Sequence, residues 1–394
     1  MIQQILKASL ITLLIASLSA GSGLADEIQM KSGETYSGRI TYEGDDIVKI
    51  EIQISSSIKE TKILSRSEIA QIAKEAPDDV EFAKIEMLLP TDSLITAASY
   101  RSMIETGPTQ FLKRFPESKH VAKVTEIKTT LEEELDKVER GFIKLEENWI
   151  SPQEREQFKT KIDSTIRFLR MEKSAAARNY NGFIGAMREY EVLEKDFHGT
   201  PAFARGVELA QQIVPTLGSQ VSGMLRDLEV RNAEYERNKA ALNEADRMQV
   251  EAARKREEEQ YQAGVAADKK RGIKWVRLNR NSQSSLESYL SLLKGENTAV
   301  GNYDTEALKA KAQKLTEVDE LIAKGNLEVA QLKLNEANDM SVVKPGAKSS
   351  KSKKGKSYGA ILGNKIDAAE EELEAKAKAL EEAKESQSLV KNLS

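Results

Sequence analysis

The chain has 394 residues, a formal net charge of −4, 31% charged side chains and only 5% aromatic ones. This balance excludes a globally basic nucleic-acid-binding protein, although it is compatible with local basic patches. The absence of cysteine excludes a thiol nucleophile, a thiolate metal site and disulfide bonds. The length is enough for two or three domains, and the abundance of Ala, Glu, Lys and Leu favours helices with solvated faces.

Residues 1–25 are predicted to be a secretory signal peptide. Lys7 supplies a positive start, Leu10 to Leu18 an apolar core, and Gly23-Leu24-Ala25 a small-residue cleavage site before Asp26. The apolar core is shorter than the roughly 20 residues that span a bilayer. We therefore expect a cleaved, exported chain in the periplasm or outside the cell, with a retained N-terminal anchor as the alternative.

Residues 26–76 are predicted to form a small β module. Apolar and polar residues alternate between short turns, which is typical of antiparallel strands with one buried face. The alternating residues are Tyr36, Gly38, Ile40 and Tyr42, followed by Val48, Ile50, Ile52 and Ile54. With its hairpin at Lys31 to Gly38, this stretch resembles the small Sm- and SH3-like barrels found at the front of exported bacterial proteins.

Residues 77–218 are predicted to form a helical domain. Pro77-Asp78-Asp79 is typical of a helix N-terminus, and the segment from Leu88 to Leu94 interrupts the first helix. This interruption resembles the signature of the uncharacterised PTPDL family of exported bacterial proteins, although the second proline is missing after Pro90-Thr91. The resemblance implies no activity.

Two stretches of this domain resemble tetratricopeptide repeats, and the clearer one runs from Asn179 to Ile213. Its packing positions hold Ala186, Tyr190, Leu193, Phe197, Gly199, Thr200, Ala204 and Leu209. An earlier stretch repeats the pattern at a constant offset with Phe111, Phe115, Ser118, Ala122 and Ile127. A third, weaker match lies between Gly325 and Ala337.

The resemblance implies an irregular array of helical hairpins, each of which buries one face against its neighbour. It predicts that Phe115 and Phe197 are buried at equivalent positions. It also predicts that Ser118 and Thr200 cap the second helix of each hairpin.

Residues 219–340 are predicted to form long helices. The segment from Ser219 to Lys270 reads as one helix, in which Val221, Leu228, Tyr235 and Leu242 are spaced by seven. Because polar residues occupy the other seam positions, we favour a helix packed within its own chain over a dimeric coiled coil. A second helical block runs from Ser282 to Met340.

The C-terminal part is predicted to be a lysine-rich linker followed by a helix. Residues 341–359 interleave lysines with Ser and Gly and have nothing to bury, which predicts disorder. Residues 360–394 form the final helix, in which Ile366, Leu373 and Leu380 are spaced by seven. This face could dock on the body of the protein, which we slightly favour, or pair with a partner.

No motif for catalysis, a cofactor or a metal stands out. The two histidines, His120 and His198, lie in turns without metal-ligand spacing, so we interpret them as solvated or packing residues. There is no phosphate-binding glycine loop. The S-x-x-K matches that begin at Ser56, Ser291 and Ser350 lack the companion motifs of penicillin-binding enzymes. We therefore expect a protein that is not an enzyme and binds no cofactor.

Two basic features are candidates for polyanion binding. The candidate residues are Lys269, Lys270, Arg271, Lys274, Trp275 and Arg277 around the indole, and Lys351, Lys353, Lys354 and Lys356 in the linker. The competing interpretation, which we favour, is that Trp275 is a buried anchor beside solvated bases and that the linker is a solubilising spacer.

The sequence favours an exported, non-enzymatic helical scaffold that binds protein partners at the cell envelope through the faces of its repeat-like hairpins. The alternative is an envelope protein that binds a polyanion through the two basic features. A hydrolase with an unrecognised site is a third and weaker hypothesis. The partner and the oligomeric state are not predicted.

Overall fold

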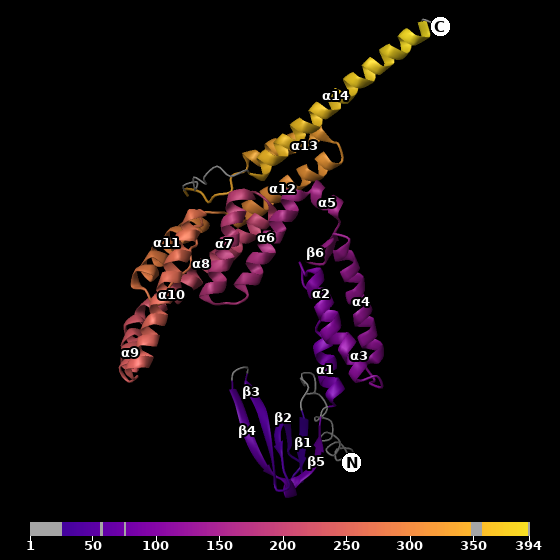
Figure 1. The fold of residues 1–394 in the computed structure, drawn as a ribbon. Helices are drawn as coiled ribbons and strands as arrows, with labels where there is room; N and C mark the ends of the chain where they lie inside the picture. Colours follow the sequence, from indigo (N-terminus) through magenta and orange to yellow (C-terminus); the bar gives the residue numbers. More distant parts are fainter. Residues whose placement is uncertain (1–25, 56–57, 75, 348–356, 393–394) are drawn as a thin grey trace, which may run out of the picture. The chain divides into compact units, whose positions relative to one another are not determined.

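The computed structural model in Figure 1 describes residues 26–55, 58–74, 76–347 and 357–392. Across these residues the chain is mostly helical and carries one small N-terminal antiparallel sheet, so the predicted fold class is confirmed at that level. The predicted signal peptide, residues 1–25, lies outside the described residues. So do residues 348–356 of the predicted lysine-rich linker.

The chain divides into two structural units, Met1–Glu147 and Asn148–Ser394. The division falls in the turn that follows strand β6 (Ile143–Leu145) and precedes strand β7 (Asn148–Ile150). The first unit contains the N-terminal sheet and four of the described α-helices, and the second contains the other ten.

The N-terminal sheet has five antiparallel strands in the order β4-β3-β2-β1-β5. Their bounds are β1 Asp26–Met30, β2 Thr35–Glu43, β3 Ile47–Ser55, β4 Ile58–Ser65 and β5 Ile69–Ala73. Pairing of Ile50 with Ile40 and of Val48 with Leu64 puts the alternating apolar residues on one face, where Ile28, Val48 and Ile50 are fully buried.

Gly38 lies where strand β2 closely approaches strand β3. A Cβ atom at this position would lie 2.3 Å from the Glu51 carbonyl oxygen, so any larger residue would force the two strands apart. The residues predicted to alternate do form an antiparallel sheet, and Val48 and Ile50 are buried as expected. Tyr42 and Ile54, at the ends of the two alternating runs, are instead more than half exposed.

The helices of the first unit pack around a small apolar core of their own. Their bounds are α1 Pro77–Glu86, α2 Ala97–Ile104, α3 Gln110–Arg114 and α4 Val121–Glu139. A π-helical turn, Glu105–Thr109, joins α2 to α3 and contains Pro108, which has no N–H to donate to the preceding turn. Phe111, Val124 and Leu131 are among the buried residues of this core.

A buried polar network fixes the segment between α1 and α2. The Thr91 hydroxyl donates to Glu134 Oε2 at 2.5 Å, and the Tyr100 hydroxyl donates to the same oxygen at 2.9 Å. Lys144 Nζ donates to Thr91 Oγ1 at 2.7 Å and to Glu134 Oε1 at 2.9 Å. Burial by itself would raise the pKa of Glu134, but the hydrogen bonds from Thr91, Lys144 and Tyr100 lower it. The segment from Leu88 to Leu94 is thus held in place through Thr91.

We expect a Thr91→Val substitution to lower the free energy of unfolding by about 1–3 kcal/mol, because Glu134 and Lys144 lose a buried partner. Because the pKa of Glu134 in the folded state is lowered from its ordinary value of 4.5, the ionised carboxylate stabilises the fold at pH values above 4.5. The difference in free energy of unfolding between wild type and Thr91→Val should therefore be full at neutral pH and shrink as the pH falls through the lowered pKa. Chemical denaturation at several pH values tests this, with the exposed Thr129→Val as control.

The second unit is built on three mutually packed helices, α6, α7 and α8. The helix bounds are α5 Pro152–Gln157, α6 Lys159–Ala175, α7 Tyr180–Asp196, α8 Pro201–Arg226, α9 Leu228–Ala240, α10 Glu244–Lys270, α11 Gln283–Gly301, α12 Thr305–Ala323, α13 Leu327–Asp339 and α14 Tyr358–Asn392. Helix α11 and the segment around Trp275 complete the core that these three helices begin.

The two repeat-like turns have the same backbone hydrogen bonds. In the first turn, Phe115 N donates to the Phe111 carbonyl and Ser118 N donates to the Phe115 carbonyl. In the second turn, Phe197 N donates to the Leu193 carbonyl and Thr200 N donates to the Phe197 carbonyl. Both phenylalanines are only half-buried, however, because each occupies the C-cap of its helix rather than the core face.

The capping predicted for these turns holds for one of them. Thr200 Oγ1 accepts from Phe203 N at 3.2 Å and caps α8. The prediction for Ser118 is wrong, because α4 has no side-chain cap. Ser118 instead donates to Asp78 Oδ2 at 2.6 Å and accepts from His120 N, which ties this turn to α1.

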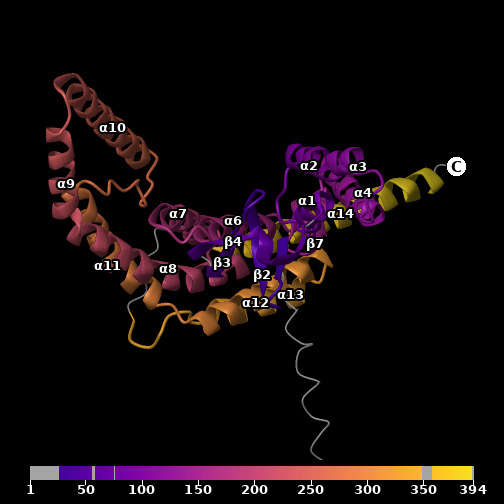
Figure 2. The same cartoon turned by 90° about the horizontal axis from the view of Figure 1, so that it is seen from below.

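The prediction of a single helix from Ser219 to Lys270 is wrong. The stretch contains the end of α8, then α9, then α10, and Figure 2 shows the chain turning back between the last two. The turn ends at Asn243, whose side-chain oxygen accepts from Asp246 N at 2.9 Å and caps α10. The Arg254 guanidinium lies 4.1 Å from the Tyr235 ring centroid and joins the two helices.

The start of α14 is anchored in a second core of this unit. The Tyr358 hydroxyl donates to Asp319 Oδ2 at 2.7 Å, and Leu362 and Ile366 are buried against α12 and α13. Leu373 and Leu380 are each 57% exposed, so only the first of the three residues spaced by seven is covered. Just before the undescribed part of the linker, Lys344 N donates to the Asn302 carbonyl at 2.9 Å.

Candidate functional site

An open groove of about 720 Å³ lies between α6 and α8 and is called the α6–α8 groove below. Phe168, Phe183 and Ile213 form its floor, and each of them is less than one-tenth exposed. Polar and charged side chains line the rim, among them Glu172, Arg205, Glu208, Gln212 and Thr216. An apolar floor with a polar rim is the arrangement that protein-binding surfaces use.

The helices that form the α6–α8 groove are positioned by local sequence signals. Asn179 Oδ1 accepts from Gly182 N at 2.9 Å and caps α7, and Pro201 follows the Thr200 cap at the first position of α8. A Cβ atom at Gly206 would lie 2.9 Å from Leu193 Cδ1, so this glycine permits close packing of α8 on α7.

The rim of the α6–α8 groove is electrostatically balanced. The Arg205 guanidinium lies 4.1 Å from the Phe168 ring centroid and 3.8 Å from Glu172 Oε1. On the other side Glu208 pairs with Lys309 of α12 and raises the pKa of that lysine. These ion pairs hold the rim side chains in place. Because these charges are paired, they give the groove no strong preference for a positively or a negatively charged partner.

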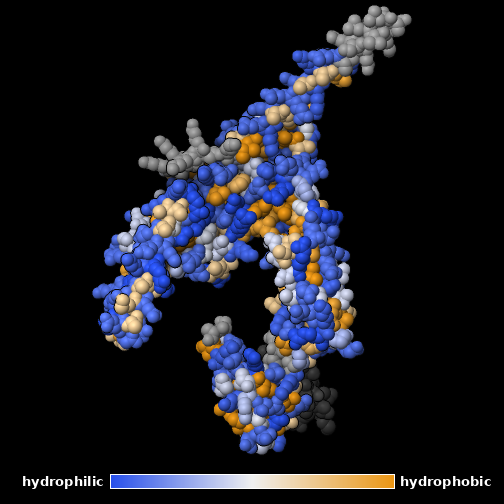
Figure 3. Space-filling view, viewed as in Figure 1, coloured by the Kyte–Doolittle hydropathy of each residue, from blue (hydrophilic) through white to orange (hydrophobic). Residues whose placement is uncertain are grey.

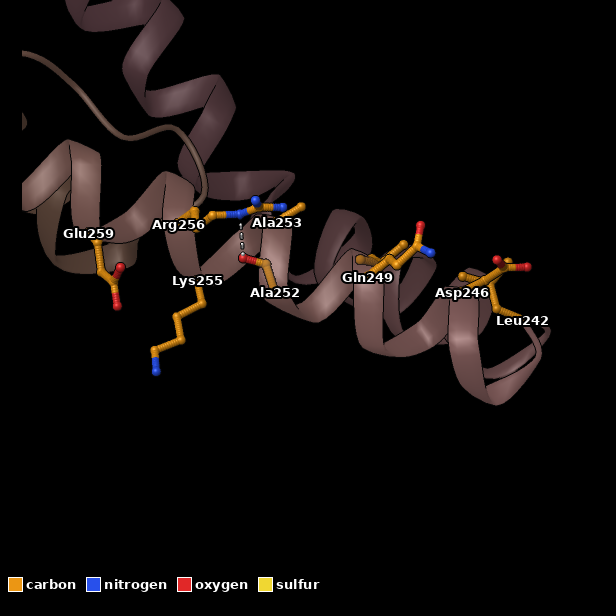
Figure 4. Close-up of a pocket in the computed structure, with 9 residues that line it drawn as sticks. Leu242, Asp246, Gln249, Ala252, Ala253, Lys255, Arg256 and Glu259 are labelled. Atoms are coloured by element: carbon orange, nitrogen blue, oxygen red, sulfur yellow. Dashed lines mark hydrogen bonds between the residues drawn. The ribbon is translucent and has the colours of Figure 1, made fainter.

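A larger surface hollow of about 930 Å³ runs along the side of α10. Apart from Leu242, which precedes the helix, every residue that lines it belongs to α10, and Figure 4 shows these side chains along the helix. Its lining includes Asp246, Lys255, Arg256 and Glu259. Because one helix supplies the lining and charged groups dominate it, this hollow is a weaker candidate than the α6–α8 groove.

The structure buries the indole of the first basic feature. Trp275 is 1% exposed and packs near Tyr289 in the main core of the second unit. Lys269 and Lys270, in the last turn of α10, are exposed. The linker residues Lys351, Lys353, Lys354 and Lys356 lie outside the described residues.

Three other candidate bases around Trp275 are paired. Arg271 and Arg277 both bind the fully buried Asp268, at 2.7 Å and 3.3 Å. Lys274 Nζ pairs with Glu296, while Lys274 N donates to both carboxylate oxygens of Glu191 at 3.0 Å. The structure therefore brings these bases together around internal carboxylates.

Sequence reasoning missed Asp268, the centre of this arrangement. Arg188 Nη2 of α7 donates to it at 3.0 Å, and Arg188 Nε donates to the Trp275 carbonyl at 2.7 Å. Burial by itself would raise the pKa of Asp268, but the hydrogen bonds from Arg271 and Arg277 and the charge of Arg188 lower it. A lone aspartate at the end of a charged helix gives no sequence signal of this role.

The histidines take part in packing and pairing. His120 stacks on Phe82 with ring centroids 3.9 Å apart, and its Nε2 lies 2.5 Å from Asp79 Oδ1. His198 packs against Phe203, and burial lowers its pKa. Across the described part of the chain, no three His, Asp or Glu side chains are grouped so that they could hold a metal ion.

The helices described here also include none that combines the length and the apolar character needed to cross a membrane. In comparisons with known proteins, no family model, no curated protein and no solved structure matched the chain.

Proposed function

We propose that this protein is an exported, non-enzymatic helical scaffold that binds protein partners at the cell envelope through the α6–α8 groove. The observation that carries the proposal is the groove itself, in which an apolar floor of Phe168, Phe183 and Ile213 lies between charged rims. A segment of a partner could place apolar side chains on this floor and polar ones on the rim.

The tetratricopeptide-like interpretation supports this proposal. The turns after α3 and α7 share their hydrogen bonds, and α6, α7 and α8 pack on one another as helical repeats do. Repeat proteins of this kind bind partners on the extended surfaces that stacked helices create. The Sm- or SH3-like barrel character of the N-terminal sheet remains part of the same proposal.

The alternative, polyanion binding, is less well supported than groove binding. Trp275 is buried and Arg271, Lys274 and Arg277 are engaged with carboxylates. Only Lys269 and Lys270 of the first basic feature lack such pairing in the contacts described above. Titration with heparin separates the two, since polyanion binding should fall steeply with salt.

We expect a photo-cross-linking residue at Gln212, which is exposed and lines the α6–α8 groove, to label envelope proteins in cells. The matched control places the same residue at Ser219, which is exposed on α8 outside the groove lining. A second variant, Thr216→Arg, should reduce labelling from Gln212 because it fills the rim. Equal labelling from Gln212 and Ser219 would contradict the proposal.

A further inference from the structure

One charged residue that lines the α6–α8 groove, Arg178, forms no ion pair within the described part of the chain. The other three charged lining residues are paired, Arg205 with Glu172 and Glu208 with Lys309. Arg178 is exposed in the loop between α6 and α7. Figure 3 shows hydrophilic residues over most of the visible surface of the second unit, with smaller hydrophobic patches between them. A partner that settles on the apolar floor must therefore also match the charges around it.

The backbone of Arg178 has the left-handed conformation that favours glycine. Its φ angle is 51°, at which a side chain with a Cβ atom is sterically strained. Two hydrogen bonds hold this conformation. Arg178 N donates to the Ala175 carbonyl at 2.9 Å, and Gln220 Nε2 of α8 donates to the Arg178 carbonyl at 3.1 Å. A change of φ would disturb both bonds, so the strain stays in the folded chain.

Three other helices of this chain end with glycine where α6 has Arg178. Gly141 after α4, Gly272 after α10 and Gly325 after α12 have φ angles of 88°, 71° and 76°. Each of their N–H groups donates to the carbonyl three residues earlier, as Arg178 does. Because glycine adopts this conformation without strain, stability of the fold does not explain an arginine here. Such departures from local preference are expected where a residue serves function.

We propose that Arg178 determines specificity in the α6–α8 groove by binding the carboxylate of an Asp or Glu side chain in the partner segment. This inference rests on the proposed function of the groove. A guanidinium group binds a carboxylate through two parallel N–H···O hydrogen bonds. Gln220, which holds the Arg178 backbone, lies one turn beyond Thr216 along α8. The acidic residue of the partner therefore lies at that end of the groove, next to its apolar side chains.

Arg178→Gly separates the contribution to binding from the contribution to the fold. The melting temperature should rise by about 2–4 °C, because the backbone strain is relieved. Photo-labelling from Gln212 should nevertheless fall by about two- to fivefold, the loss expected for one exposed ion pair. Either a lower melting temperature or unchanged labelling would overturn the inference.

The matched control is Glu146→Gly. Glu146 is exposed, has a φ angle of 55° and does not line the groove. Its replacement relieves the same kind of backbone strain and should leave labelling from Gln212 unchanged. Labelling in envelope extract at 1 M sodium chloride adds a test of charge, because the Debye length there is about 3 Å. Wild type and Arg178→Gly should then label equally, and a difference that persists would contradict an ion pair.

The chemistry of the partner group is tested with a carbodiimide, which joins an amine to a carboxylate as an amide and takes up the water to become a urea. Arg178→Lys supplies the amine at this position. With envelope extract, the variant chain should couple through position 178 to an Asp or Glu side chain of the protein that Gln212 labels. Mass spectrometry of the digested product locates the bond. Absence of coupling at position 178 to a protein that Gln212 does label would overturn the inference.

Failure of this inference can be distinguished from failure of the proposed function. Equal labelling of envelope proteins from Gln212 and Ser219 in the otherwise wild-type chain would overturn groove binding, and this inference with it. Stronger labelling from Gln212 that is insensitive to Arg178→Gly would overturn the role of Arg178 alone and leave groove binding standing.

Discussion

Replacing Trp275 by alanine should lower the free energy of unfolding by about 3–5 kcal/mol, the range for large aromatic side chains removed from a core. Trp275 is 1% exposed and is among the largest fully buried side chains of the chain. Chemical denaturation followed by circular dichroism measures the effect, because helices dominate the fold.

The control for Trp275→Ala is a double substitution of the exposed neighbours, Lys269→Ala with Lys270→Ala. Surface changes of this kind usually alter stability by no more than about 0.5 kcal/mol. The pair of experiments also separates packing from polyanion binding. If Trp275→Ala left stability unchanged and abolished heparin binding, the indole would be a ligand contact and not part of the core.

Replacing Asp268 by alanine should lower the free energy of unfolding by about 1–3 kcal/mol, because it removes a fully buried carboxylate that accepts hydrogen bonds from three arginines, which are themselves partly exposed. Arg188, Arg271 and Arg277 would be left together without their common carboxylate. The exposed Glu257→Ala in the same helix is the control and should change stability little.

Asp268→Asn, which keeps the shape of the side chain, tests the charge by pH. Because the folded-state pKa of Asp268 is lowered below its ordinary value of 3.8, its charge stabilises the fold above that value. The stability difference between wild type and Asp268→Asn should be full at neutral pH and narrow as the pH falls through the lowered pKa. A difference that grew on acidification would contradict the assigned cause.

The elements that sequence predicted well are those with a strong local pattern. Period-two alternation from Val48 to Ile54 determined a strand, and the threonine–proline pair at Thr200 determined the start of α8. These signals depend only on residues that are neighbours in the sequence, so they can be recognised without knowledge of the tertiary structure.

The features that sequence missed depend on distant contacts. Asp268 gains its role from Arg188, which is far away in the chain, and no spacing rule connects them. The turn between α9 and α10 could have been found from Asn243 and Asp246, a capping pair that the seven-residue spacing obscured. The α6–α8 groove likewise exists only once both helices have packed.

The two ends of the lysine-rich segment are both fastened to the second unit. Lys344 is held at Asn302, and Tyr358 N donates to the His198 carbonyl at 2.8 Å. The described backbone on either side of residues 348–356 is therefore anchored to the same unit. The free energy of joining two anchored points depends weakly on chain length, since doubling the length of a flexible connection costs only about 0.6 kcal/mol in closure entropy. The attachment of α14 to its unit should therefore change little when residues are inserted or deleted between the two anchors.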